Sequence, residues 1–179
     1  MKQISDMSMP ELAGFLCDAL KAEDIPVVLS GGSCVEIYSR GEYTSYDIDL
    51  INQYNEQFKK IKKLMESLGF SEKDRYFVHP DTKLFVEFPS GPLGVGDAPV
   101  EEIAELDTEA GVLRLLTPTD CIKDRLAAYY HWNDEQSLHQ AVWVARQNDF
   151  DLEDVRQWSK NEGELKKFND FEEMLAVEK

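Results

Sequence analysis

The sequence predicts a mixed α/β (α+β) fold, in which a mixed sheet is flanked by helices and followed by a C-terminal helical extension. Short β-prone apolar runs alternate with amphipathic segments up to residue 116, and turn residues separate them. Beyond residue 117 only helical periodicity is visible. We therefore expect a core over residues 1–117 and a helical subdomain over 118–179 packed on it.

The first half of the core alternates helix and strand. Ser8 and Glu11 have the spacing of a capping box, which predicts the start of a helix. An apolar run predicts a buried strand over 26–29, and the residues after it predict a short helix over 33–40. Alternating residues then predict a strand over 46–51.

The second half of the core is expected to complete the sheet. A helix runs from about residue 55 to 68 and carries four lysines. Two short runs, 75–78 and 83–88, predict a hairpin, and 111–116 predicts a further strand. Between them, the proline- and glycine-containing stretch 89–99 predicts a loop.

The C-terminal segment reads as a small helical bundle. Thr117 followed by Pro118 is a start signal, with an N-cap and a proline at the first helical position. Amphipathic patterns then predict helices over 134–148, 152–160 and 164–177.

Composition limits the class of protein. The 179 residues, 42% of them hydrophobic, suit one domain or a compact core with an extension. No apolar run reaches the length of a membrane span, and the N-terminus lacks a signal-peptide pattern, so we expect a cytoplasmic protein without membrane contact. Three widely spaced cysteines in apolar surroundings are expected to be reduced core residues.

The composition is strongly acidic. With 35 acids against 19 bases the net charge is −16, which disfavours nonspecific binding of duplex DNA. The one compact basic cluster, at 59–63, is most simply a solvated helix face. A local tRNA-sized contact through it stays open, as does docking to a basic partner protein.

A glycine turn follows the first strand. Gly31 and Gly32 allow backbone N–H groups to approach a ligand closely, and Ser33 would stand at a helix N-terminus, where phosphate oxygens bind well. The alternative is an ordinary strand-to-helix turn in which Ser33 is only an N-cap.

Two carboxylates follow on the next strand. Asp47 and Asp49 project from one face of the strand over 46–51. Such close carboxylates repel each other unless a cation lies between them, and Mg²⁺ prefers oxygen ligands. The alternative is the solvated face of an edge strand. The order of strand, glycine turn, helix and acid pair favours a metal site, because the fold would bring both pieces to one end of adjacent strands.

The runs LSGGS at 29–33 and DIDL at 47–50 resemble the signature of the polymerase-β-like nucleotidyltransferase superfamily. The run GEYTSY at 41–46, just before the acids, resembles the corresponding segment of a small bacterial branch related to AbiEii-type toxin nucleotidyltransferases. The resemblance implies a nucleotidyltransferase-like fold. It also implies Mg²⁺- or Mn²⁺-dependent transfer of a nucleoside monophosphate from a nucleoside triphosphate to a hydroxyl of a tRNA, a protein or a small molecule, with release of pyrophosphate.

The resemblance also implies roles for further residues. The superfamily commonly adds a third acid from a later strand, which corresponds to Glu87 as a metal ligand or proton acceptor. A lysine early in the helix after the sheet reaches the triphosphate in related proteins, which corresponds to Lys123. The alternatives are an exposed strand glutamate and a surface lysine paired with an acid one turn away.

A second class of function stays open. The same fold could serve as a catalytically silent nucleotide-binding or protein-interaction module, including one half of a toxin–antitoxin pair. The retention of both Asp47 and Asp49 argues against it, because a module without metal chemistry has no need of that repulsive pair. A dinucleotide-binding oxidoreductase is disfavoured, since the glycine turn lacks the third glycine of that fingerprint.

Overall fold

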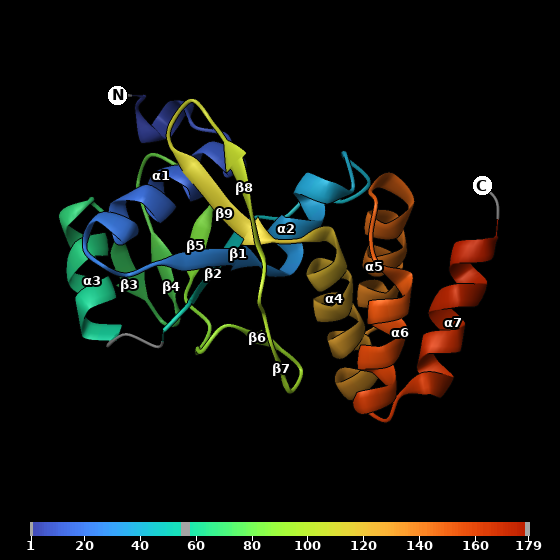
Figure 1. Ribbon diagram of the computed structural model, residues 1–179. Helices are drawn as coiled ribbons and strands as arrows, with labels where there is room; N and C mark the ends of the chain where they lie inside the picture. The colour runs from blue at the N-terminus through green and yellow to red at the C-terminus, as the bar shows by residue number, and fades with distance from the viewer. Residues whose placement is uncertain (1, 55–57, 178–179) are drawn as a thin grey trace.

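A computed structural model describes residues 2–54 and 58–177. Within these residues, seven strands form one mixed sheet with helices packed around it (Figure 1), which confirms the expected mixed α/β fold. In chain order the elements are the 3₁₀ turn η1 (Ile4–Asp6), α1 (Met9–Ala22), β1 (Val27–Ser30), α2 (Gly31–Tyr38), β2 (Asp47–Asn52), α3 (Phe58–Ser67), β3 (Ser71–Lys73), β4 (Tyr76–Val78), β5 (Phe85–Glu87), β6 (Gly94–Val95), β7 (Ala98–Pro99), β8 (Ile103–Asp107), β9 (Val112–Leu116), α4 (Pro118–Trp132), α5 (Glu135–Gln147), α6 (Leu152–Asn161) and α7 (Leu165–Ala176).

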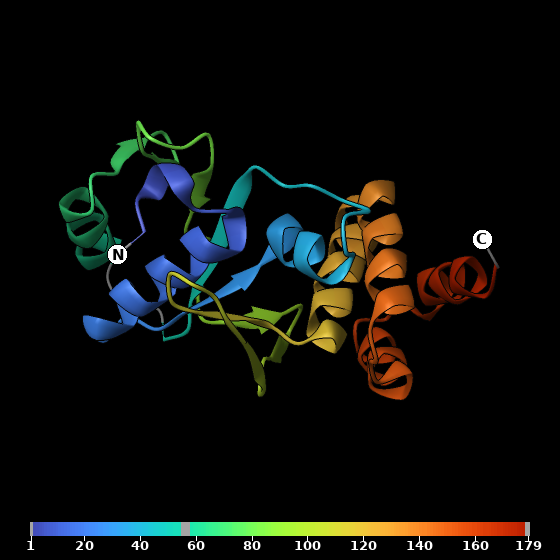
Figure 2. The same cartoon turned by 90° about the horizontal axis from the view of Figure 1, so that it is seen from above.

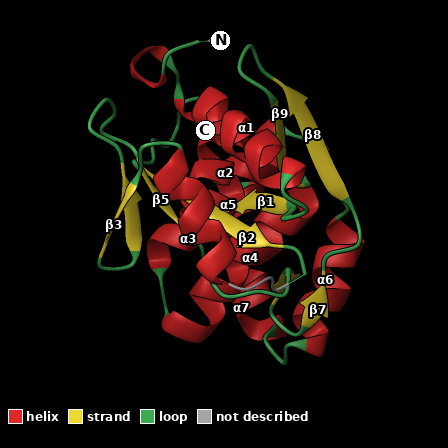
Figure 3. Ribbon diagram, turned by 90° about the vertical axis from the view of Figure 1, so that its left-hand side faces the viewer, coloured by secondary structure: helices red, strands yellow, loops and turns green. Residues whose placement is uncertain are grey.

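The strand order brings four strand ends to one edge of the sheet. The order is β3-β4-β5-β2-β1-β9-β8, with β3 and β8 at opposite sides (Figure 3). Strand β1 runs antiparallel to β2 and parallel to β9, while β2 runs parallel to β5. The ends of β1 and β9 therefore share an edge with the beginnings of β2 and β5. Helices α2 and α4 both begin at this edge, because each follows one of those strand ends directly.

Helix α1 packs against β1 and β9 and fills one face of the sheet. Its side chains Leu12, Leu16 and Leu20 are fully buried, in keeping with their helical spacing. The predicted capping box is present, since the Ser8 N–H donates to Glu11 Oε2 at 2.7 Å. This layer anchors the strands that carry the candidate site.

Helix α2 lies between the sheet and the bundle of α4 to α7 (Figure 2). The Tyr38 hydroxyl at its end donates to the Leu116 carbonyl on β9 at 2.7 Å, and the Asn148 side-chain amide donates to the Tyr38 carbonyl at 2.8 Å. The bundle begins as expected: Thr117 is the N-cap of α4 and accepts from the Asp120 N–H at 3.2 Å. The short helix α2 thus connects the sheet to the helical bundle of α4 to α7.

The start of α2 differs from the prediction. We expected the helix to open at Ser33, but it begins at Gly31, and Ser30 is its N-cap. The positive φ of +63° at Gly31 is the reason, since it lets the chain turn from strand into helix without an intervening loop. Both glycines therefore belong to the first helical turn.

The hairpin of β4 and β5 confirms the pairing expected for 75–78 and 83–88. The predicted loop over 89–99 instead contains the small hairpin of β6 and β7. Strands of two residues carry too little periodicity to be read from sequence, and the Val95 carbonyl of this hairpin accepts a hydrogen bond from Trp158 Nε1 at 3.2 Å.

Strands β3 and β8 were not predicted, because both are largely exposed and therefore lack an apolar pattern. Of the helix expected over 55–68, residues 55–57 lie outside the described residues, and the described part is α3.

Two expectations about the class of protein can be compared with the structure. The three cysteines, Cys17, Cys34 and Cys121, are buried and free, as expected for reduced core residues. No helix among residues 2–54 and 58–177 is long and apolar enough to cross a membrane.

Candidate functional site

The structure brings the three predicted acids to one face of the sheet. Asp49 is paired with Ser30 on β1 and with Glu87 on β5, while Asp47, two residues earlier on β2, is paired with Phe85. Paired residues in neighbouring strands point to the same face, so all three carboxylates lie on one side. Ile48 and Leu50 point to the other side, where both are fully buried. The alternation expected for this strand is therefore observed.

The glycine turn lies directly against Asp49. At Gly31, an added Cβ atom would stand 2.0 Å from Asp49 Oδ2, and the φ of +63° independently favours glycine. The carboxylate of Asp49 is thus held beside the N-terminus of α2. Unpaired N–H groups and the positive end of the helix dipole favour an anion at such a position. The glycine turn and Asp49 therefore lie side by side, at the edge where the order of elements in the sequence predicted that they would meet.

Asp49 is the electrostatic centre of this site. Its burial, together with the negative charges of Asp47 and Glu87, raises its pKa to about 7, against an opposing effect from Arg125. The shift thus reflects first the loss of solvent around the carboxylate and then the neighbouring negative charges. A bound cation would oppose both effects, because it favours the ionised form of every carboxylate around it.

Asp47 and Glu87 are each held by one neighbour. The Ser45 hydroxyl donates to Asp47 Oδ1 at 2.6 Å, and Arg75 Nε lies 3.5 Å from Glu87 Oε1. With the side chains directed in this way, no three His, Cys, Asp or Glu residues of the described chain converge closely enough to hold a metal ion. Asp47 and Asp49 lie two residues apart on the same face of β2, with Glu87 on the neighbouring strand β5.

The donor chemistry fits a hard divalent cation. Asp47, Asp49 and Glu87 offer only carboxylate oxygens, which Mg²⁺ and Mn²⁺ prefer, and no imidazole or thiolate takes part. Mg²⁺ also keeps part of its coordination sphere for water and substrate phosphates. These residues can therefore supply the protein's share of such a site.

The remaining residues of the glycine turn are less accessible. Ser33 is fully buried, and its hydroxyl has no hydrogen-bond partner among the described residues. An added Cβ atom on Gly32 would lie 3.1 Å from Tyr43 Cε1 and 3.2 Å from Ser45 Oγ. The backbone of the turn, not the Ser33 hydroxyl, is thus the part of this segment nearest to the carboxylates.

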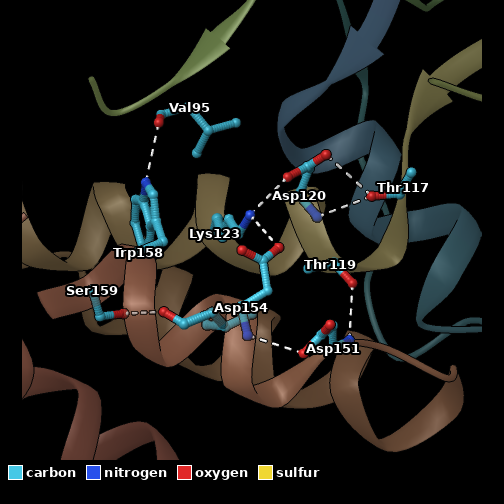
Figure 4. Close-up of polar contacts among 10 residues, drawn as sticks. Val95, Thr117, Thr119, Asp120, Lys123, Asp151, Asp154, Trp158 and Ser159 are labelled. Atoms are coloured by element: carbon cyan, nitrogen blue, oxygen red, sulfur yellow. Dashed lines mark hydrogen bonds and ion pairs between the residues drawn. The ribbon is translucent and has the colours of Figure 1, made fainter. Parts of the chain in front are cut away.

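The Lys123 side chain points toward Asp120 and Asp154, as Figure 4 shows. Its ammonium lies 3.2 Å from Asp120 Oδ1, one turn earlier in α4, and 2.7 Å from Asp154 Oδ2 on α6. Burial lowers its pKa, but the hydrogen bond to Asp154 and the charge of Asp120 outweigh this and raise it, so the lysine stays cationic. The ion pair with an acid one turn away is the simpler of the two alternatives derived from the sequence.

Lys123 lines a cavity of about 540 Å³ whose wall includes none of the three site acids. This cavity lies between the β6–β7 hairpin, the start of α4 and α6. Its lining residues are Ala98, Pro99, Glu101, Glu102, Thr117, Thr119, Asp120, Lys123, Asp151, Asp154, Gln157, Trp158 and Asn161.

Besides Arg75 at Glu87, a buried cation acts on the acids: the charge of Arg125 opposes the rise in the pKa of Asp49, and sequence reasoning missed this arginine. Its guanidinium donates from Nε and Nη2 to Asp124 Oδ2 at 2.9 and 2.5 Å, and its charge acts on Asp49. Burial lowers its pKa, but the pair with Asp124 more than compensates, and the group stays charged. A signal was present: Arg125 is four residues after Cys121, and therefore on the buried face of the helix.

No protein-family model and no curated protein matches the sequence. Similar solved structures include two of the antibiotic-resistance factor ANT(2'')-Ia. Its solution structure aligns over 87% of this chain and 92% of its own, with 17% identity and a TM-score of 0.48. Its crystal structure in complex with adenylyl-2''-tobramycin aligns over 74% and 95%, with 14% identity and a TM-score of 0.40. Similarity at this level assigns neither activity nor substrate.

Proposed function

We propose that this chain is a divalent-metal-dependent nucleotidyltransferase, which moves a nucleoside monophosphate from a nucleoside triphosphate to an acceptor hydroxyl and releases pyrophosphate. One observation carries the proposal: Ser30, Asp49 and Glu87 are paired across three neighbouring strands, with Gly31 at the N-terminus of α2 in contact with Asp49. An anion-binding helix N-terminus and a cation-binding carboxylate group then lie side by side, as a metal–triphosphate substrate requires.

Each residue has a role in this reaction. The backbone of Gly31 and Gly32 holds the β- and γ-phosphates, and Ser33, the next residue of the turn, completes this phosphate site. Asp47 and Asp49 would hold the metal, which would neutralise charge on the phosphates and on the leaving pyrophosphate. The acceptor oxygen attacks the α-phosphorus while the α–β P–O bond breaks. Glu87 accepts the proton of the acceptor hydroxyl or serves as a further metal ligand.

The two cations of α4 have different parts in the proposal. Arg125 is held rigidly and adds positive charge near Asp49, which suits the accumulating charge of the triphosphate. Lys123 reaches a phosphate only after leaving Asp120 and Asp154. The lysine would then act as a group that the nucleotide recruits.

The acceptor belongs to one of three classes, a tRNA, a protein or a small molecule, and the acidic surface leaves room for a basic partner protein. A catalytically silent nucleotide-binding module of the same fold, or one half of a toxin–antitoxin pair, is the second candidate. The burial of the Ser33 hydroxyl and the pairing of Lys123 favour it, since both groups need to move before they touch a nucleotide.

Calorimetric titration of ATP, GTP, CTP and UTP tests the proposal. The protein is titrated with Mg²⁺, with Mn²⁺ and with EDTA, alongside Asp47→Asn and the control Asp107→Asn, whose carboxylate is exposed on β8. We expect metal-dependent binding that Asp47→Asn abolishes and Asp107→Asn retains, followed by pyrophosphate release once an acceptor is supplied. Binding that survives EDTA and Asp47→Asn equally would contradict the metal site. Metal-dependent binding without pyrophosphate release from any acceptor class would support the silent module.

A further inference from the structure

The arginines of this chain fall into two groups. Within the described residues, four of the six form ion pairs with carboxylates, while Arg40 and Arg146 form none. In a protein of net charge −16, two arginines without an acidic partner are conspicuous. Both line the same cavity, of about 560 Å³, together with Pro118, Gln147, Asn148 and Asp149.

Arg146 is oriented without being neutralised. Its Nη2 donates to the carbonyls of Met174 and Val177 at 2.7 Å each. Backbone carbonyls fix the guanidinium in place but carry no formal charge, so the positive charge of Arg146 remains available to a ligand.

Arg40 reaches the same cavity from the other side. It stands two residues beyond the end of α2, in the left-handed conformation with φ +52°, and its side chain is exposed. The loop that carries it extends to the end of α5 (Figure 1), where Asn148 holds the Tyr38 carbonyl. The position of Arg40 relative to Arg146 is thus set by a hydrogen bond between their elements.

We propose that this cavity binds a phosphate group between Arg40 and Arg146. A guanidinium presents a planar set of N–H donors that matches the oxygens of phosphate, and two of them around one cavity can share the anion. Pro118 places the N-terminal turn of the 15-residue helix α4 at the cavity wall, and its dipole favours the same charge. Against these stands Asp149, the single carboxylate among the described lining residues.

The phosphate can come from two sources: a free anion, such as inorganic phosphate or pyrophosphate, or a phosphodiester of an oligonucleotide strand. Helix α2 spans about 12 Å between the candidate phosphate turn and the region of Arg40. The cavity lining includes neither a residue of the turn at 31–33 nor any of the three site acids, so its occupation does not depend on the proposed reaction.

Calorimetry without metal or nucleotide tests this site. Inorganic phosphate, pyrophosphate and a five-nucleotide RNA are titrated in EDTA at low salt into wild type, Arg40→Gln and Arg146→Gln. Lys166→Gln serves as the control, because it removes the same charge from an exposed position on α7. We expect wild type to bind at least one probe, Arg40→Gln and Arg146→Gln to weaken it about tenfold, and Lys166→Gln to change it less than about twofold.

Each outcome has a defined meaning. Tighter binding of the RNA than of the free anions identifies a phosphodiester, and the reverse order identifies a free anion. No binding of any probe, or unchanged binding by Arg40→Gln, overturns the proposal. In that case the two arginines only stabilise helix C-termini, and the glutamine variants would differ from wild type only in a lower melting temperature. Arg40 is exposed, so its variant keeps the test valid even if Arg146→Gln fails to fold. Arg40→Gln should show the metal-dependent nucleotide binding of wild type, which separates this site from the proposed reaction.

Discussion

Asp49 Oδ2 occupies the space beside Gly31 that any larger residue would need, 2.0 Å from the position of an added Cβ atom. Strand β2 and the first turn of α2 therefore fit together only with glycine at this point. The contact ties the candidate phosphate turn to the candidate metal pair, although the two are separated by the loop after α2.

We expect Gly31→Ala to destabilise the protein by about 2 kcal/mol or more, because it adds both backbone strain and a clash with Asp49. Gly41→Ala is the matched control, since Gly41 also has positive φ, at +97°, but an added Cβ atom there meets nothing within 4 Å. Urea unfolding of both variants isolates the clash. The double variant Gly31→Ala/Asp49→Ala should regain part of the loss, and equal losses for Gly31→Ala and Gly41→Ala would contradict the contact.

We expect Asp49→Asn to stabilise the metal-free protein at pH 8. Burial and the charges of Asp47 and Glu87 raise the pKa of Asp49 from 3.8 to about 7, so the folded state holds a proton that the unfolded state releases. The wild type therefore loses stability as pH rises from about 4 through 7, whereas the variant does not. The gain at pH 8 should be about 1–3 kcal/mol and should vanish near pH 4.

Unfolding in EDTA at several pH values measures this effect, with Asp107→Asn on the exposed strand β8 as the control. If the free energies of unfolding of wild type and Asp49→Asn differ by the same amount at every pH in that range, the pKa of Asp49 is not raised in the folded state. The same variant should lose metal-dependent nucleotide binding, so that stability and function change in opposite directions.

We expect Arg125→Gln to lower the free energy of unfolding by about 2–3 kcal/mol, because it leaves the half-buried carboxylate of Asp124 without its charged partner. Arg156→Gln is the comparison, since its pairs with Glu153 and Glu172 are more exposed and should be worth about 1 kcal/mol or less. If chemical unfolding shows the same loss of free energy for Arg125→Gln and Arg156→Gln, the ion pair of Arg125 contributes no more to stability than the exposed pairs of Arg156. Arg125→Lys should restore the charge but not the two-point contact with Asp124.

We expect Asp154→Asn to tighten nucleoside triphosphate binding about two- to fivefold, because it frees Lys123 from one of its two carboxylates. Lys123→Gln should weaken binding by a similar factor. Glu101→Gln is the control: it removes one charge from the same cavity without any contact to Lys123. If Lys123→Gln and Asp154→Asn both bind nucleotide like wild type in calorimetry, the lysine serves only to pair α4 with α6.

Much of the local structure followed from the sequence, because it depends on residues close together in the chain. The capping box of Ser8 and Glu11, the N-cap Thr117 and the alternation of Asp47 and Asp49 with buried neighbours all involve contacts within four residues. The order of strand, glycine turn, helix and acid pair likewise predicted a shared site, and the register of β1 with β2 brings the pieces together.

The tertiary structure alone decided which distant groups meet. The pairing of Asp49 with Glu87 depends on strand register, and register follows from the packing of the whole sheet. The different environments of Lys123 and Arg125, two residues apart, depend on the rotation of α4 about its axis, which contacts with α2, α5 and α6 determine. The cavity of Arg40 and Arg146 likewise joins residues more than one hundred positions apart. Local patterns select elements, whereas burial of their apolar faces against each other selects the neighbours of each charged group.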